Sequence, residues 1–168
     1  NGRRSPAVTG NVDVAATIVD LAGLEVPANM DGISLMPIVT ASRKRVRDAM
    51  PLIQVWGTAG TLALGVVTEK YKFVFWCYGD GVEPTEELFH LESDPFEMKN
   101  LASDPRYQGV LADMRAHYDM ALQHWKRHAV RDNEYQPVGT LFDRTIPWAE
   151  KSGALPKAFR KSVPAGRQ

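Results

Sequence analysis

Residues 87–101 read ELFHLESDPFEMKNL, and this stretch predicts a strand, a turn and the start of a helix in close succession. The apolar run over residues 88–91 is typical of a short β-strand. The Asp94-Pro95 pair is a turn signal that ends this strand. Asp94 and Glu97 have the three-residue spacing of a helix capping box, so the pattern predicts that a helix begins at Asp94.

A second informative stretch lies near the N-terminus, where residues 11–24 read NVDVAATIVDLAGL. Apolar residues recur there at helical spacing, which predicts a helix over residues 12–24. Asn11 or Asp13 is the expected N-cap, and Gly23 is the expected C-terminal stop. Few residues nearby can cover the apolar side of this helix, so we expect it to pack on protein outside this chain.

The middle of the chain changes to short strands followed by one long helix. Short connectors such as Glu69-Lys70 favour antiparallel hairpins over crossovers. The predicted strands are residues 52–56, 62–68, 71–78 and 88–91. Asp104-Pro105 reads as the N-cap and first residue of a helix. An apolar stripe along this helix is expected to cover one face of the sheet: Tyr107, Val110, Leu111, Met114, Tyr118, Ala121, Leu122 and Trp125.

These elements predict an α+β fold, in which a small antiparallel sheet is packed by a C-terminal helix and preceded by helices of another domain. A basic connector, SRKRVR at residues 42–47, marks the boundary; such runs are usually solvated linkers, although they can touch an anion. The predicted domains are residues 1–48, 49–128 and 129–168. The last segment lacks a sustained period and is predicted to be an extended arm. Its candidate anchors are Phe142, Ile146 and Trp148.

Both stretches resemble one family. Residues 88–101 resemble the LYDLxxDPxExxNL signature near the C-terminus of type I sulfatases, with Phe89-His90 in place of Tyr-Asp. Residues 11–39 are similar to the segment that ends the catalytic domain of these enzymes, where Ala16-Thr17 replaces the usual Pro-Thr and favours an unbroken helix. The resemblance implies the C-terminal portion of a formylglycine-dependent sulfatase, whose first part holds the closing helices of an α/β alkaline-phosphatase-like domain.

The resemblance also implies where the chemistry lies. These sulfatases use a formylglycine made from the Cys or Ser of a Cys/Ser-x-Pro-x-Arg motif, and a divalent cation, usually calcium, that neutralises the sulfate oxygens. Cys77 lacks the proline and arginine of that motif, and no serine of the chain fits it. The resemblance therefore implies sulfate-ester hydrolysis, on a sulfated carbohydrate, by a parent whose upstream catalytic domain is the partner of this chain. This chain alone is expected to have no catalytic residue. A parent that cleaves phosphate or phosphonate esters is the related alternative.

Two kinds of binding site have candidates. Trp56 and His90 are candidates for contact with substrate at the rim of the parent's pocket, because an aromatic ring near a strand end can stack on a sugar. The competing interpretation is that such residues belong to a core. Three histidines, His117, His124 and His128, fall within about 40° on the predicted helix and can bind zinc, although surface histidines are commoner.

Composition limits the partners. Twenty basic and twenty acidic residues give a formal net charge of zero, which disfavours attraction to nucleic acid through overall charge. No apolar run is long enough for a membrane span. The single cysteine, Cys77, excludes an internal disulfide.

The start at Asn1 suggests a fragment, and the resemblance implies a periplasmic or secreted parent. If the partner domain is missing, exposed apolar surface is expected to favour a homo-oligomer. Two other functions stay open: a stand-alone interaction module, which predicts no exposed apolar face on the helix at 12–24, and a zinc-binding histidine module.

Overall fold

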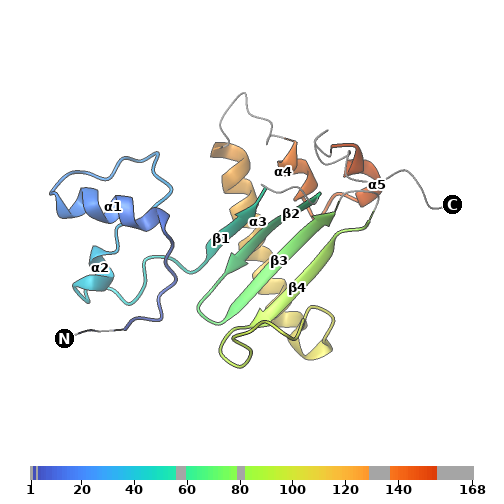
Figure 1. The fold of residues 1–168 in the computed structure, drawn as a ribbon, viewed down its shortest axis with the longest axis horizontal. Helices are drawn as coiled ribbons and strands as arrows, with labels where there is room; N and C mark the ends of the chain where they lie inside the picture. The colour runs from blue at the N-terminus through green and yellow to red at the C-terminus, as the bar shows by residue number, and fades with distance from the viewer. Residues whose placement is uncertain (1, 3, 56–59, 79–81, 129–136, 155–168) are drawn as a thin grey trace. The chain divides into compact units, whose positions relative to one another are not determined.

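The computed structural model describes residues 2, 4–55, 60–78, 82–128 and 137–154 of the chain (Figure 1). The chain divides into two compact units, residues 1–50 with 67–69 and residues 51–66 with 70–168. The first unit carries helices α1 and α2, and the second carries nearly all of the sheet and the remaining helices.

Helix α1 (Val12–Leu21) is shorter than the predicted 12–24 because its C-terminus closes in a Schellman turn. Gly23 has a φ of 73°, a left-handed conformation that ends the helix, and its N–H donates to the carbonyl oxygen of Asp20 at 2.9 Å. The N–H of Leu24 donates to the carbonyl oxygen of Val19 at 3.2 Å. The prediction of Gly23 as the stop of this helix is confirmed.

Asp13, in the first turn of α1, is fully buried and organises the start of the helix. Its carboxylate accepts hydrogen bonds from the N–H of Gly10 at 2.8 Å and from the N–H of Ile33 at 2.9 Å. It also forms an ion pair with the guanidinium of Arg47. Asn11, the residue at the N-cap position, makes no side-chain cap hydrogen bond, so the buried carboxylate rather than an N-cap side chain fixes this end.

Helix α2 (Met36–Val39) follows a loop that packs closely on α1. The N–H of Leu35 donates to Thr17 Oγ1 at 2.9 Å, which ties the end of the loop to α1. A Cβ atom at Gly32 would lie 2.0 Å from the carbonyl oxygen of Val12, so only glycine allows the loop to approach α1 this closely. Backbone and hydroxyl contacts therefore hold the loop in place.

The second unit is built on a four-stranded antiparallel sheet with strand order β1-β2-β3-β4, which confirms the predicted sheet (Figure 1). Its strands are β1 (Met50–Gln54), β2 (Thr61–Val67), β3 (Tyr71–Tyr78) and β4 (Thr85–His90). The register of β3 and β4 pairs Phe73 with Leu88, and both side chains are fully buried. β3 has the predicted bounds, and the other three strands are displaced by a few residues from theirs.

A long helix covers one face of this sheet, as the apolar stripe predicts (Figure 1). The carboxylate of Asp104 accepts from the N–H of Arg106 at 3.0 Å and caps the 3₁₀ turn η1 (Pro105–Tyr107), which leads into α3 (Gln108–His128). The ring of Tyr118 packs edge-on against β3. The buried residues of α3 are Leu111, Met114, Tyr118 and Leu122.

The prediction of an extended arm over residues 129–168 is wrong for residues 137–154, which are the part of that segment that the structure describes. This part forms α4 (Val138–Leu141), α5 (Trp148–Lys151) and the 3₁₀ turn η2 (Ser152–Ala154). The side chains of Val138, Leu141 and Phe142 are fully buried in the core between α3 and the sheet. Helices of four residues are too short to show a period in the sequence, which explains the error.

The turn predicted at Asp94-Pro95 is confirmed, whereas the helix that the capping-box spacing predicts does not form, because turns and irregular structure follow Asp94. The carboxylate of Asp94 accepts hydrogen bonds from the N–H groups of Met98 at 3.0 Å and Lys99 at 2.8 Å. These hydrogen bonds hold the pKa of Asp94 below its usual value. Glu97 has a φ of 56°, which no helix residue adopts. The same Asp-x-x-Glu spacing therefore closes a loop.

The end of this loop runs along the outer side of β4. The side chain of Asn100 accepts from the N–H of Leu88 at 3.0 Å and donates to the carbonyl oxygen of Glu86 at 3.1 Å. The N–H of Leu101 donates to the carbonyl oxygen of Leu88 at 2.8 Å. The asparagine and leucine of the signature thus bind the backbone of the strand with which the signature begins.

Candidate functional site

His90 is half-buried at the end of β4, and its side chain stabilises the turn that follows. Its Nδ1 accepts a hydrogen bond from the N–H of Ser93 at 3.1 Å and lies 2.7 Å from Ser93 Oγ. Its ring packs edge-on against Tyr71, with 4.8 Å between ring centroids. Trp56, the other candidate for substrate contact, lies outside the described residues.

Helix α3 brings two of the three candidate histidines together. The exposed rings of His124 and His128 stack with 4.1 Å between centroids. His128 Nδ1 lies 2.8 Å from the carbonyl oxygen of His124, close to the end of the helix. His117 lies two turns earlier and is half-buried. Among the described residues there is no group of three or more His, Cys, Asp or Glu side chains that could hold a metal ion.

Cys77 points into the core of the second unit and is fully buried. Its Sγ donates to the carbonyl oxygen of Leu141 at 3.3 Å. Burial raises the pKa of the Cys77 thiol to about 12, although the nearby ammonium of Lys151 acts in the opposite direction. A thiol with this pKa is protonated at neutral pH, so Cys77 is a core residue and not a nucleophile.

We expect the Cys77 thiol to resist modification in the folded chain. At about pH 8, Ellman's reagent should not react with the native protein, and one thiol should react after unfolding in guanidinium chloride. A Cys77→Ser variant is the blank for both measurements. Rapid labelling of the native protein would contradict both the burial and the raised pKa.

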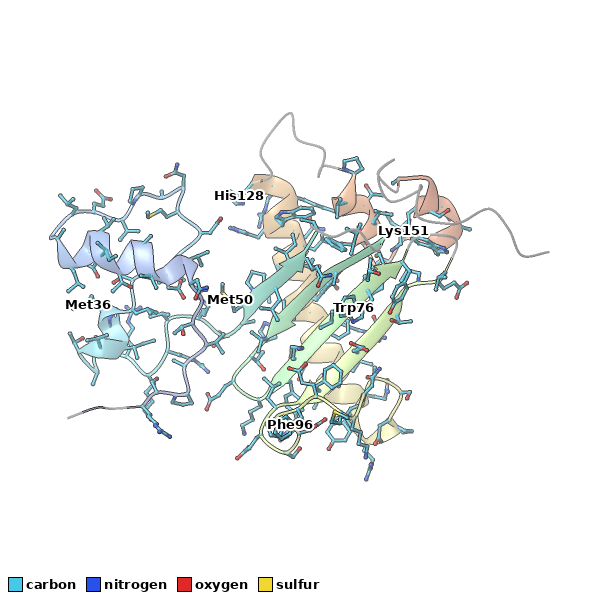
Figure 2. All side chains as sticks on the ribbon, in the orientation of Figure 1. Met36, Met50, Trp76, Phe96, His128 and Lys151 are labelled. Atoms are coloured by element: carbon cyan, nitrogen blue, oxygen red, sulfur yellow. The ribbon has the colours of Figure 1, made fainter. Side chains whose placement is uncertain are left out.

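Lys151 is a buried charged residue that sequence patterns did not single out (Figure 2). Its Nζ donates to the carbonyl oxygen of Asp143 at 2.5 Å and lies 4.9 Å from the centroid of the Phe75 ring. Burial lowers the pKa of Lys151. These contacts hold α5 against the sheet, and they lie in the segment predicted to be extended, where no periodic signal exists.

A cavity of about 1000 Å³ lies in the first unit and is lined by basic residues from two separate segments. Arg4 comes from the segment before α1, and the others come from the connector after α2. The basic lining residues are Arg4, Arg43, Lys44 and Arg45. The basic run at 42–47 by itself is typical of a linker. The fold places Arg4 at the same cavity as this run, and the sequence gives no sign of that proximity.

None of the helices that the structure describes is long and apolar enough to cross a membrane.

Comparison with known proteins gives a consistent result. Residues 1–124 match the family described as "N-sulphoglucosamine sulphohydrolase, C-terminal". Choline-sulfatase of Rhizobium meliloti is 36% identical over 126 residues, which cover 72% of this chain and 23% of that protein. Delta 4,5-hexuronate-2-O-sulfatase of Bacteroides thetaiotaomicron is 35% identical over 115 residues, which cover 64% of this chain and 22% of that protein. Arylsulfatase K of Xenopus laevis is 33% identical over 188 aligned positions, gaps included, which cover 99% of this chain and 35% of that protein.

Solved structures show the same relationship. A structure described as a 2-O GAG sulfatase superposes with a TM-score of 0.56 at 34% identity, over 67% of this chain and 24% of that one. A structure described as a complex with its substrate D-glucosamine-2-N,6-O-disulfate superposes with a TM-score of 0.60 at 23% identity, over 71% of this chain and 25% of that one. This match shows a shared fold.

The four-stranded sheet, the helix that covers it and the loop that binds β4 define the C-terminal portion of an alkaline-phosphatase-like sulfatase. The chain belongs to the N-sulphoglucosamine sulphohydrolase C-terminal family. It spans between 22% and 35% of the length of the three curated relatives named above. The sulfatase resemblance of the two sequence blocks is thereby confirmed.

Proposed function

We propose that the intact protein containing this chain hydrolyses sulfate esters of a sulfated carbohydrate. The observation that carries this proposal is the match of residues 1–124 to a sulfatase family. A carbohydrate substrate is supported by two relatives, one described as a hexuronate sulfatase and one as a GAG sulfatase. A parent that cleaves phosphate or phosphonate esters is the alternative, and the upstream nucleophile distinguishes the two.

The proposed role of this chain is to complete the catalytic domain with residues 1–48 and to carry a C-terminal subdomain that begins at residue 49. Helix α1 and the residues just after it expose four large apolar side chains, with exposed fractions of 54–64%: Val14, Ile18, Leu21 and Leu24. Apolar side chains gathered on one helix favour a protein partner, and we propose the upstream catalytic domain. The stand-alone interaction module predicts that this face is covered, so the exposure counts against it. A homo-oligomer through this face is the second proposal for its partner.

The proposed nucleophile and metal belong to the upstream part of the parent. A formylglycine and calcium would supply the attacking hydroxyl and the charge that neutralises the sulfate. The described residues of this chain do not fit either group, because Cys77 is buried and no three donor side chains gather into a metal site. This chain is therefore proposed to contribute packing and pocket shape, with no step of the reaction assigned to it.

The test is to purify the intact protein and measure sulfate release from sulfated mono- and oligosaccharides, with mass spectrometry to detect the formylglycine. We expect release by the intact protein and none by residues 1–168 alone. An upstream sequence without a Cys/Ser-x-Pro-x-Arg motif, or release of phosphate but not sulfate, would overturn the proposal.

The proposed rim position of Trp56 and His90 has its own test in the intact protein. We expect Trp56→Ala to raise KM for the sulfated substrate severalfold, with kcat and Tm unchanged, because a stacking residue at the rim contributes to substrate binding. His90→Ala serves as the comparison, since His90 also braces a turn and its loss should lower Tm. A Trp56→Ala variant with a normal KM and a lowered Tm would assign Trp56 to a core.

A further inference from the structure

We infer that the basic cavity of the first unit is a binding subsite for the sulfate groups of a saccharide chain, an inference that rests on the proposed sulfatase function. Four cationic side chains line this cavity of about 1000 Å³: Arg4, Arg43, Lys44 and Arg45. A volume of about 1000 Å³ is at the upper end of the range for small-molecule sites, roughly 300–1000 Å³, which leaves room for more than one sugar.

The segment that carries three of these cations starts from a tight turn after α2. Ala41 has a φ of 59°, so the chain reverses there in a left-handed conformation. The N–H of Arg43 donates to the carbonyl oxygen of Pro37 at 2.9 Å, and Ser42 Oγ donates to the same oxygen at 3.1 Å. Thr40 Oγ1 donates to the carbonyl oxygen of Met36 at 2.8 Å. The basic run therefore starts from a hydrogen-bonded turn, which distinguishes it from a free linker.

The charge of the cavity is positive although the whole chain is neutral. Glu69 also lines it, and Asp48 pairs with Arg45 at 3.0 Å. Four basic side chains against these two carboxylates leave a local charge of +2. No carboxylate among the described residues forms an ion pair with Arg4, Arg43 or Lys44. Arginine binds sulfate-like oxyanions through two parallel hydrogen bonds, and exposed cations can do so without first breaking an ion pair.

The remaining lining residues disfavour single-stranded nucleic acid as the ligand of this cavity. The apolar residues that line the cavity are aliphatic, and such side chains can pack against the C–H groups of a sugar ring: Pro6, Ile38, Val39 and Ala41. Single-stranded nucleic acid is bound mainly by aromatic side chains that stack on its bases. Tryptophan, tyrosine and phenylalanine do not occur among the described residues that line the cavity. The cations therefore provide the groups that bind sulfate, and the choice of a saccharide as the carrier of that sulfate follows from the proposed sulfatase function.

The inference is tested by binding measurements on the intact protein, with a fully sulfated heparin octasaccharide as the probe. The double variant Arg43→Gln/Lys44→Gln removes two cations of the cavity, and Lys99→Gln/Arg127→Gln removes two exposed cations of the second unit as the matched control. Each exposed cation contributes modestly to the binding of an anion, so we expect the Kd of the octasaccharide to rise about tenfold when two are removed in the cavity variant. The control and the wild type should bind alike.

A second variant and two further measurements keep the result clear. Arg4→Gln, from the other segment, should weaken octasaccharide binding about threefold, and a chemically desulfated octasaccharide should not bind. Sulfate release from a small monosulfated substrate should be the same in every variant, because the proposed reaction centre lies upstream. Equal loss of binding in the cavity and control variants, unchanged binding in the cavity variant, or equal binding of the desulfated chain would overturn the subsite. Absence of sulfate release from the wild type would instead overturn the proposed function, and the octasaccharide result would still decide the subsite.

Discussion

Replacing Asp13 by Ala should lower the free energy of unfolding of the first unit by about 3–5 kcal/mol, the range for breaking a buried ion pair by removing one partner. The Asp13 carboxylate is 0% exposed and binds the N–H groups of Gly10 and Ile33 as well as the Arg47 guanidinium. Its removal leaves a mostly buried cation and two amide groups without their acceptor. Urea denaturation followed by circular dichroism measures the loss. Hydrogen exchange at the amides of Gly10 and Ile33 shows whether the stability is lost at this site.

The control for this prediction is Asp20→Ala on the same helix. Asp20 is exposed and accepts a hydrogen bond from the hydroxyl of Ser34, so its loss should cost less than about 1 kcal/mol. If both variants lost the same stability, the effect would come from helix propensity alone, and the buried carboxylate would have no special role in this unit.

Replacing Phe142 by Ala should destabilise the second unit by about 3–5 kcal/mol, the range for removing a buried aromatic side chain from a core. Phe142 is 0% exposed, packs against Trp125 with 5.9 Å between ring centroids, and its carbonyl oxygen accepts the hydroxyl of Tyr118 at 2.6 Å. A cavity at this position would loosen the contact between α3 and the segment that follows it. Thermal and urea denaturation of the whole chain measure the change in the free energy of unfolding.

Phe96→Ala is the matched control, because it removes the same atoms from a side chain that is 83% exposed (Figure 2). We expect a change of less than about 0.5 kcal/mol. A Phe142→Ala variant as stable as Phe96→Ala would show that residues 137–154 do not contribute to the core in solution, and the predicted arm would regain support.

The sheet and the long helix could be predicted because their signals extend over many residues. β3 contains a run of aromatic and β-branched residues, and α3 repeats its apolar residues over about five turns. A local signal that is compatible with more than one structure does not determine which one forms. An Asp followed three residues later by Glu can begin a helix or close a loop, and the left-handed backbone of Glu97 decides for the loop here.

The candidate sites show the same limit. The sequence predicts Phe142 as an anchor but contains no signal for the helical turn before it, because four residues show no period. The cavity in the first unit depends on Arg4 and Arg43 lying at one surface, and residues 39 positions apart in a sequence without repeats give no signal of proximity. Burial also decides the chemistry of Cys77 and Lys151, and it depends on contacts made across the fold.

The loop that binds β4 has a consequence for assembly. Open sheet edges recruit strands from other molecules, and this sheet has two such edges. On β4, the side chain of Asn100 and the N–H of Leu101 already occupy backbone groups of Glu86 and Leu88. On β1, Pro51 removes one donor from the ladder. Strand addition is therefore less favourable at these edges than at uninterrupted ones, which disfavours growth of this sheet into intermolecular fibrils.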